Sequence, residues 1–132
     1  MARKNRLSFT IVELMVVISV ITLLVIISVS SFIRARQRTQ ATMTLNAVRM
    51  LDAAVDQWAT EYGIGDGMAI TLASLAPYVK PGNPFGAILS AGNAPADALG
   101  NAFVFGVVGS RQVTVSNATK EALSGIVVWG PY

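Results

Sequence analysis

The sequence predicts an α+β fold in which one long N-terminal helix is followed by a small antiparallel sheet packed against the helix's second half. The first observation is the distribution of helix-breaking residues, because all 11 glycines and all 5 prolines lie beyond Tyr62. The second is a run of apolar residues near the N-terminus. The third is a turn-rich C-terminal half with short strand-like segments. With 132 residues, the chain has room for one ordinary domain.

The first helix is expected to cover residues 9–62, which makes it roughly 80 Å long at about 1.5 Å per residue. Residues 14–33 contain no charge and are apolar on every face. A stretch of about 20 such residues matches the thickness of a lipid bilayer, and a chain this short cannot surround it with a core of its own. We therefore expect residues 9–33 to form a membrane-spanning segment.

From Arg34 onward the apolar pattern narrows to one side of the expected helix. Apolar side chains recur at steps of three or four between residues 45 and 62, with polar residues between them. Residues 34–62 are therefore predicted to continue the helix and to support the C-terminal part of the chain. The residues expected to pack on that part are Val48, Val55, Trp58 and Tyr62.

Residues 63–132 are predicted to form a small head that needs the helix as one wall of its core, because 70 residues bury little surface on their own. A short helix is expected at residues 71–79, with Thr71 as its N-cap and Pro77 limiting its length. Residues 81–100 are interpreted as a variable surface loop. Three strands are predicted at residues 102–107, 111–115 and 126–129, with a hairpin turn at Gly109-Ser110 and a turn or short helix at 117–123.

The composition excludes several classes of function. The chain has neither cysteine nor histidine, so it forms no disulfide, no Cys/His zinc site and no histidine-dependent catalytic pair. We expect no catalytic residues, no cofactor and no metal; a calcium site is not predicted because only Asp97 and Glu121 carry carboxylates beyond Asp66. The net charge of +3 comes from Arg3, Lys4 and Arg6, so nucleic acid is not an expected partner.

The start of the apolar run has two unusual features. A secretory signal peptide is disfavoured, because the run is too long for such a signal and its far end lacks a small-x-small cleavage site. Three basic residues lie on each side of the run, so charge alone does not orient it in a membrane. Glu13 is a carboxylate near the start of the run, where it is costly unless paired, and this makes it a candidate functional residue.

Residues 6–18, with the sequence RLSFTIVELMVVI, resemble the N-terminal signal of type IV pilins and of type II secretion pseudopilins. The resemblance implies that residues 1–8 are a basic leader, cut by a prepilin peptidase on the cytoplasmic side between Ser8 and Phe9. Phe9 then becomes the N-methylated first residue of a mature chain of 124 residues, since eight of 132 are removed. Two features depart from the family: Ser8 replaces the usual glycine, and the second half of the span has no proline.

The same resemblance implies a pilin-like fold and a place in a filament. The N-terminus would stay in the cytoplasm and the head would lie in the periplasm of a bacterium, until the subunit leaves the inner membrane for a homo-oligomeric filament. The implied partners are other pseudopilins or pilins, the peptidase and an inner-membrane assembly platform. Glu13 would set the axial register of a subunit by meeting the N-terminal amine of its neighbour. Relatives with a proline in this segment can unwind the helix there. In this chain, any local unwinding would depend on Ser28, Ser30 and Ser31, whose hydroxyls compete for backbone hydrogen bonds.

Three functional hypotheses remain open at this point. The first is a filament subunit that supports protein secretion. A pseudopilus is favoured over a surface pilus by the compact head, the absence of cysteine and the similarity of residues 97–105 to major pseudopilins. The second is a minor pilin that binds DNA or a surface, which requires a basic head. The third is a membrane-anchored enzyme, for which the sequence offers no catalytic set.

Overall fold

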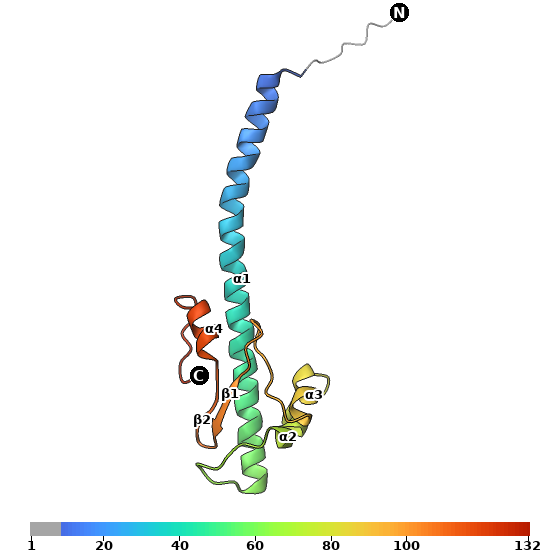
Figure 1. Ribbon diagram of the computed structural model, residues 1–132, viewed down its shortest axis with the longest axis vertical. Helices are drawn as coiled ribbons and strands as arrows, with labels where there is room; N and C mark the ends of the chain where they lie inside the picture. Colours follow the sequence, from blue (N-terminus) through green and yellow to red (C-terminus); the bar gives the residue numbers. More distant parts are fainter. Residues whose placement is uncertain (1–8) are drawn as a thin grey trace, which may run out of the picture. The chain divides into compact units, whose positions relative to one another are not determined.

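The computed structural model describes residues 9–132, so the predicted leader with Ser8 lies outside the described residues. The predicted α+β class is confirmed as one long N-terminal helix with a small antiparallel sheet of two strands (Figure 1). The described residues divide into two compact units, one that ends at Arg36 and one that begins at Gln37. The elements in chain order are α1 (Ile11–Tyr62), α2 (Leu72–Leu75), the 3₁₀ helix η1 (Ala76–Tyr78), α3 (Pro84–Ser90), β1 (Val104–Val107), β2 (Ser110–Thr114) and α4 (Asn117–Ala122).

Helix α1 contains 52 residues and begins at Ile11, two residues after the predicted start. It continues without interruption because no glycine or proline occurs before Gly63. Gly63 has a φ of 62°, in the left-handed region that glycine adopts readily. The backbone N–H of Ile64 then donates to the carbonyl of Ala59 at 2.9 Å, which closes the last turn of the helix.

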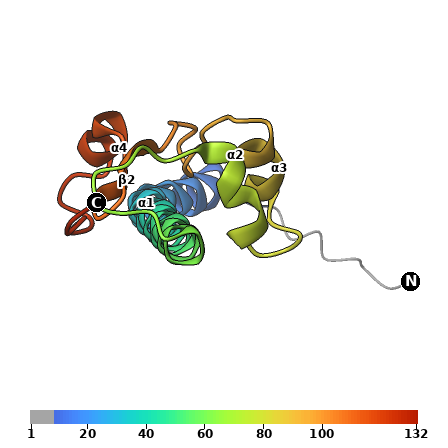
Figure 2. The ribbon, with the colours of Figure 1, turned by 90° about the horizontal axis from the view of Figure 1, so that it is seen from below.

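The second unit builds its core around the C-terminal half of α1. Val48, Leu51 and Val55 are fully buried there. Helices α2 and α3 lie on one side of this part of α1, and the hairpin with α4 lies on the other (Figures 1 and 2). The head therefore uses the helix as its central wall, as expected for so few residues. The buried side chains that complete the core come mainly from Leu75, Val79, Leu89, Phe103, Val113 and Val115.

The sheet is a two-stranded hairpin, and the predicted third strand at residues 126–129 is wrong. Strands β1 and β2 pair antiparallel, and the turn lies at Val108 and Gly109, one residue earlier than predicted. Residues 126–129 lie between Gly125 and Gly130, and the positive φ angles of these two glycines turn the chain before and after the segment. The segment packs against the core through the side chain of Trp129 instead of pairing through its backbone.

The prediction of a surface loop over residues 81–100 is also wrong in part, because α3 lies within it. The side chain of Asn83 caps this helix by accepting a hydrogen bond from the backbone N–H of Phe85 at 3.0 Å, and Pro84 occupies the first helical position. Leu89 of α3 is fully buried. Thr71 does stand at the N-cap of α2, as predicted, although its side chain makes no capping hydrogen bond.

Candidate functional site

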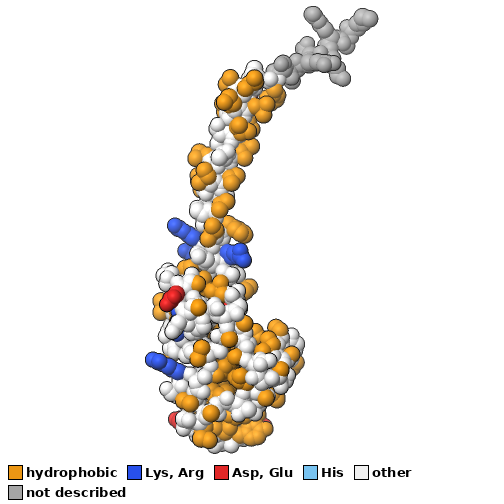
Figure 3. Space-filling view, in the orientation of Figure 1, with side chains coloured by type: hydrophobic (Ala, Val, Ile, Leu, Met, Phe, Trp, Pro, Cys, Tyr) orange, Lys and Arg blue, Asp and Glu red, His pale blue; other side chains and the backbone are white. Residues whose placement is uncertain are grey.

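The first candidate site is the apolar surface of the first half of α1. Its large hydrophobic side chains are exposed, with Ile11 at 78% and Leu23 at 61%. On the face shown in Figure 3, hydrophobic side chains cover this part of the helix and a group of Lys and Arg side chains follows. Among the described residues, α1 is the one helix long and apolar enough to cross a membrane, and none of its apolar window is buried within the chain.

The hydroxyl groups in this segment are bonded within the helix itself. Ser19 donates to the carbonyl of Met15 and Thr22 to that of Ile18, both at 2.7 Å. The carbonyl of Ile27 accepts from the hydroxyls of both Ser30 (3.0 Å) and Ser31 (3.4 Å). Each polar side chain therefore has a partner that does not depend on water, which is what an apolar environment requires.

Glu13 and Thr10 form a reciprocal cap at the start of α1. The backbone N–H and the hydroxyl of Thr10 donate to Oε2 of Glu13 at 2.9 and 3.0 Å, and the backbone N–H of Glu13 donates to the hydroxyl of Thr10 at 3.2 Å. This is a capping box, in which two otherwise unpaired N–H groups of the first turn are satisfied. The Thr-x-x-Glu spacing is the usual sequence signal of this motif, but the motif was not among the features predicted above. Phe9, Thr10 and Glu13 thus lie together at the entrance to the apolar segment.

The residues predicted to pack helix against head behave as expected in three of four positions. Val48 and Val55 are fully buried, and Trp58 is 6% exposed. Tyr62 contradicts the prediction, since it is 67% exposed. It is the last residue of α1, and the chain turns away at Gly63, so that the head leaves most of its ring uncovered.

Two carboxylates on the second half of α1 connect the helix to the head. The side-chain amide of Gln112 donates to Oδ1 of Asp56 at 2.8 Å. The hydroxyl of Tyr78 donates to Oε2 of Glu61 at 2.5 Å, and this hydrogen bond raises the pKa of Tyr78 to about 12. Burial, together with the nearby charge of Asp56, raises the pKa of Asp52 above its usual value. Asp56 and Glu61 therefore connect α1 to β2 and to η1 through these two hydrogen bonds.

Asp97 organises the loop that precedes β1. Its Oδ1 accepts hydrogen bonds from the backbone N–H groups of Leu99 (2.9 Å) and Asn101 (3.0 Å). Its Oδ2 accepts a hydrogen bond from the hydroxyl of Thr119 in α4, a residue with no exposed surface. Thr119 in turn accepts from the side-chain amide of Asn101 at 2.8 Å. The role of Asp97 in this structure is therefore to join its loop to α4.

Among residues 9–132, no group of three or more acidic, cysteine or histidine side chains is placed to hold a metal ion. Comparisons with protein-family models, curated proteins and solved structures found no match to this chain. The residues that the structure brings together at a candidate site are thus those at the start of α1 and along its apolar surface.

Proposed function

We propose that this chain is a structural subunit of a type II secretion pseudopilus or a related type IV pilus-like filament. The first half of α1 holds the subunit in the inner membrane and later packs against other subunits in the filament. The observation that supports the proposal is the exposed apolar surface of residues 11–33. These residues belong to the same uninterrupted helix whose later residues form one wall of the head core. A soluble monomer does not leave such a surface uncovered.

The physical driving force favours burial of this segment in lipid or among neighbouring helices. Burying an exposed Leu, Ile, Val or Phe side chain contributes roughly 1.5–3 kcal/mol. The segment carries more than a dozen such side chains. In a filament, copies of the same segment bury one another, and a head-to-tail contact that does not close into a ring continues as a helical polymer.

Glu13 is proposed to set the register between subunits. Both bonds from Thr10 go to Oε2, and among the described residues Oε1 of Glu13 accepts no hydrogen bond. An unpaired carboxylate in an apolar environment costs several kcal/mol, and an ammonium group of a neighbouring subunit offsets much of that cost. A subunit at the correct axial position therefore satisfies both charges, whereas a misaligned one satisfies neither.

Processing supplies that ammonium group in this proposal. Removal of residues 1–8 leaves Phe9 as the N-terminal residue, one helical turn before Glu13. The basic leader remains on the cytoplasmic side and the head lies in the periplasm. The partners are then other subunits of the filament, the prepilin peptidase and an inner-membrane assembly platform.

The test is filament assembly in a bacterium that provides the peptidase and the platform. Glu13→Ala and Glu13→Gln are expected to insert and lose the leader normally, but to enter sheared filaments at a small fraction of the parent level. Thr22→Val is the matched control, because Thr22 lies in the same segment and its hydroxyl bonds only to its own helix. Normal incorporation of Glu13→Ala into filaments would contradict the register role of Glu13. An intact leader on the parent chain would contradict the proposed function itself.

A further inference from the structure

Two arginines, Arg34 and Arg36, follow directly after the apolar segment of α1 and are called the arginine pair below. Both side chains are exposed. Among residues 9–132, no hydrogen bond or ion pair involves either guanidinium group. The helix supplies no acid near them, because no Asp or Glu occurs between Glu13 and Asp52. The arginine pair is therefore a cationic group that its own helix leaves without a counter-charge.

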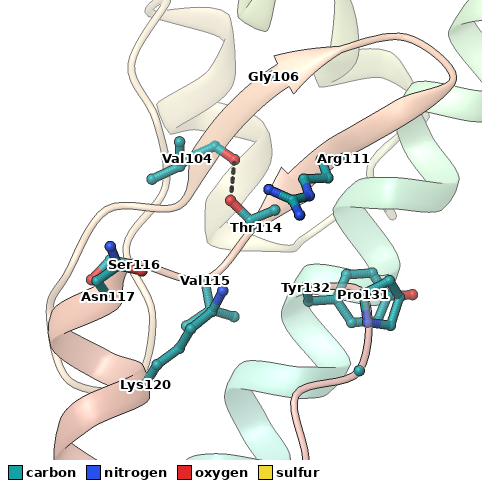
Figure 4. A pocket seen from close by; sticks show the side chains of 11 residues that line it. Val104, Gly106, Arg111, Thr114, Val115, Ser116, Asn117, Lys120, Pro131 and Tyr132 are labelled. Atoms are coloured by element: carbon teal, nitrogen blue, oxygen red, sulfur yellow. Dashed lines mark hydrogen bonds between the residues drawn. The ribbon is translucent and has the colours of Figure 1, made fainter.

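The cations of the head have different surroundings. Arg111 and Lys120 line a cleft of about 800 Å³ between the hairpin, the start of α4 and residues 130–132 (Figure 4). Arg111 also lines a smaller hollow of about 190 Å³ together with Asp52. An acid of the same chain thus shares a hollow with Arg111. The arginine pair, by contrast, is open to an anion from outside the chain.

The position of the arginine pair along α1 matches the edge of a lipid bilayer. Arg34 follows Glu13 by 21 positions, which correspond to roughly 30 Å of helix at about 1.5 Å per residue. The hydrocarbon core of a bilayer is about 30 Å thick. On the face shown in Figure 3, cationic side chains follow the end of the apolar covering. When residues 14–33 span the bilayer, Arg34 and Arg36 therefore lie level with one layer of lipid phosphate groups.

The chemistry of arginine suits phosphate at this depth. The planar guanidinium group donates two parallel hydrogen bonds to phosphate oxygens, and the apolar stem of the side chain packs along apolar surface. Two positions of an α-helix correspond to a rotation of about 200°, so Arg34 and Arg36 face nearly opposite sides of α1. Each arginine therefore meets a different lipid molecule.

We propose that Arg34 and Arg36 bind the phosphate groups of anionic phospholipids in the leaflet on the head side of the membrane. This inference rests on the proposed function, since it concerns the membrane-bound state of the subunit. A headgroup without an ammonium group of its own is preferred, because the arginines then meet a net negative charge. The contact would fix the depth of the helix and hold the subunit in the bilayer before assembly.

Processing makes this contact more important. Removal of residues 1–8 takes away the basic side chains on the cytoplasmic side of the apolar segment. The basic side chains that still flank the segment are then those of Arg34, Arg36 and Arg38. Electrostatic attachment to lipid headgroups thus passes from both ends of the segment to the end that leads into the head.

The lipid selectivity of the full-length protein tests the contact. The protein is reconstituted in vesicles of phosphatidylcholine that contain a minor fraction of phosphatidylglycerol. Spin-labelled forms of the two lipids report, by electron paramagnetic resonance, how strongly each is immobilised beside the protein. We expect phosphatidylglycerol to be preferred about fivefold and the preference to fall at high salt.

A set of variants locates the preference along the chain. All are made in a background in which the leader does not attract anionic lipid. Arg34→Gln with Arg36→Gln is expected to lower the preference to less than about twofold, whereas Arg34→Lys with Arg36→Lys retains most of it because the charge remains. Arg49→Gln is the matched control and leaves the preference unchanged, since Arg49 is an exposed arginine of the same helix within the second unit. The background substitutions are Arg3→Gln, Lys4→Gln and Arg6→Gln.

The outcomes separate the lipid contact from the proposed function. A preference that survives Arg34→Gln with Arg36→Gln overturns the lipid contact and leaves the proposed function standing. Loss of the preference with inorganic phosphate, but not with chloride at the same ionic strength, assigns the arginine pair to free phosphate and also overturns it. Absence of filaments from a parent chain that keeps its lipid preference overturns the proposed function alone.

Discussion

The two halves of α1 use the same residue types in opposite ways. Leu23 in the first half is 61% exposed, whereas Leu51 in the second half has no exposed surface. The polar side chains differ as well: in residues 11–33 they bond to groups three or four positions away, as Ser19 does to Met15. In the second half, Glu61 and Asp56 are bonded to Tyr78 and Gln112, which are 17 and 56 positions away.

The difference shows which half is satisfied within one chain. The second half packs its apolar stripe against the head and bonds two of its carboxylates, Asp56 and Glu61, to it, so it contributes to the stability of the subunit. The polar groups of the first half are satisfied within the helix, but its apolar side chains are not buried within the described residues. Equivalent substitutions in the two halves should therefore change different measurements.

The largest expected effect is that of Trp58→Ala. Trp58 is 6% exposed in the head core, so its truncation is expected to lower the free energy of unfolding by about 3–5 kcal/mol. Tyr62→Ala, four residues later but 67% exposed, should change it by less than about 0.5 kcal/mol. Denaturant unfolding of the full-length protein in detergent micelles measures both. Equal losses for the two variants would contradict the assigned burial.

The next effect compares one substitution in both halves. Leu51→Ala is expected to cost about 2–5 kcal/mol of head stability, because it leaves a cavity in a closed core. Leu23→Ala should leave head unfolding unchanged and reduce filament yield instead, since that side chain is 61% exposed and belongs to no buried core among the described residues. A stable Leu51→Ala head would show that the second half is not the wall of the core.

A smaller effect is expected at the network around Asp97. Thr119→Val removes the hydroxyl between Asp97 and Asn101 and leaves both without that partner, at a cost of about 1–3 kcal/mol. Thr114→Val is the matched control, because its hydroxyl makes one long bond of 3.4 Å to the carbonyl of Val104. Thermal unfolding of the two variants should separate them clearly, and identical midpoints would mean that the network adds nothing.

The smallest effect is a pH dependence at the join between α1 and η1. The pKa of Tyr78 is raised from 10.0 to about 12 by its hydrogen bond to Glu61. A raised pKa means that the protonated phenol is favoured in the folded protein, so this stabilisation is complete below pH 10 and is lost as the pH rises toward 12. Melting curves over this interval should fall more for the parent than for Tyr78→Phe. Parallel curves would rule out the contribution.

Sequence patterns predicted the helix and its buried stripe well because both are local. The absence of glycine and proline and the three-to-four spacing are sufficient to place Val48, Val55 and Trp58 on one face. The buried stripe was predicted to extend to Tyr62, but Tyr62 is exposed, because periodicity does not show where the head stops covering the helix. The capping box of Thr10 and Glu13 was readable from its spacing and was missed.

The head was harder to predict because its contacts are distant in sequence. Helix α3 has a recognisable start at Asn83-Pro84, but the small residues around it concealed the burial of Leu89. The partnership of Asp97 with Thr119 spans 22 positions and has no sequence signal. Residues 126–129 have the composition of a strand, yet strand formation depends on a partner with free backbone groups, which local pattern does not reveal.

The most direct test of the account is the intact mass and N-terminal fragment spectrum of the protein recovered from its native membranes. We predict a chain of 124 residues, lacking residues 1–8 and carrying one methyl group on the α-amine of Phe9. That result would establish prepilin-type processing and leave the choice between pseudopilus and pilus. A chain that still begins at Met1, or one cut at the far end of the apolar segment, would contradict the account.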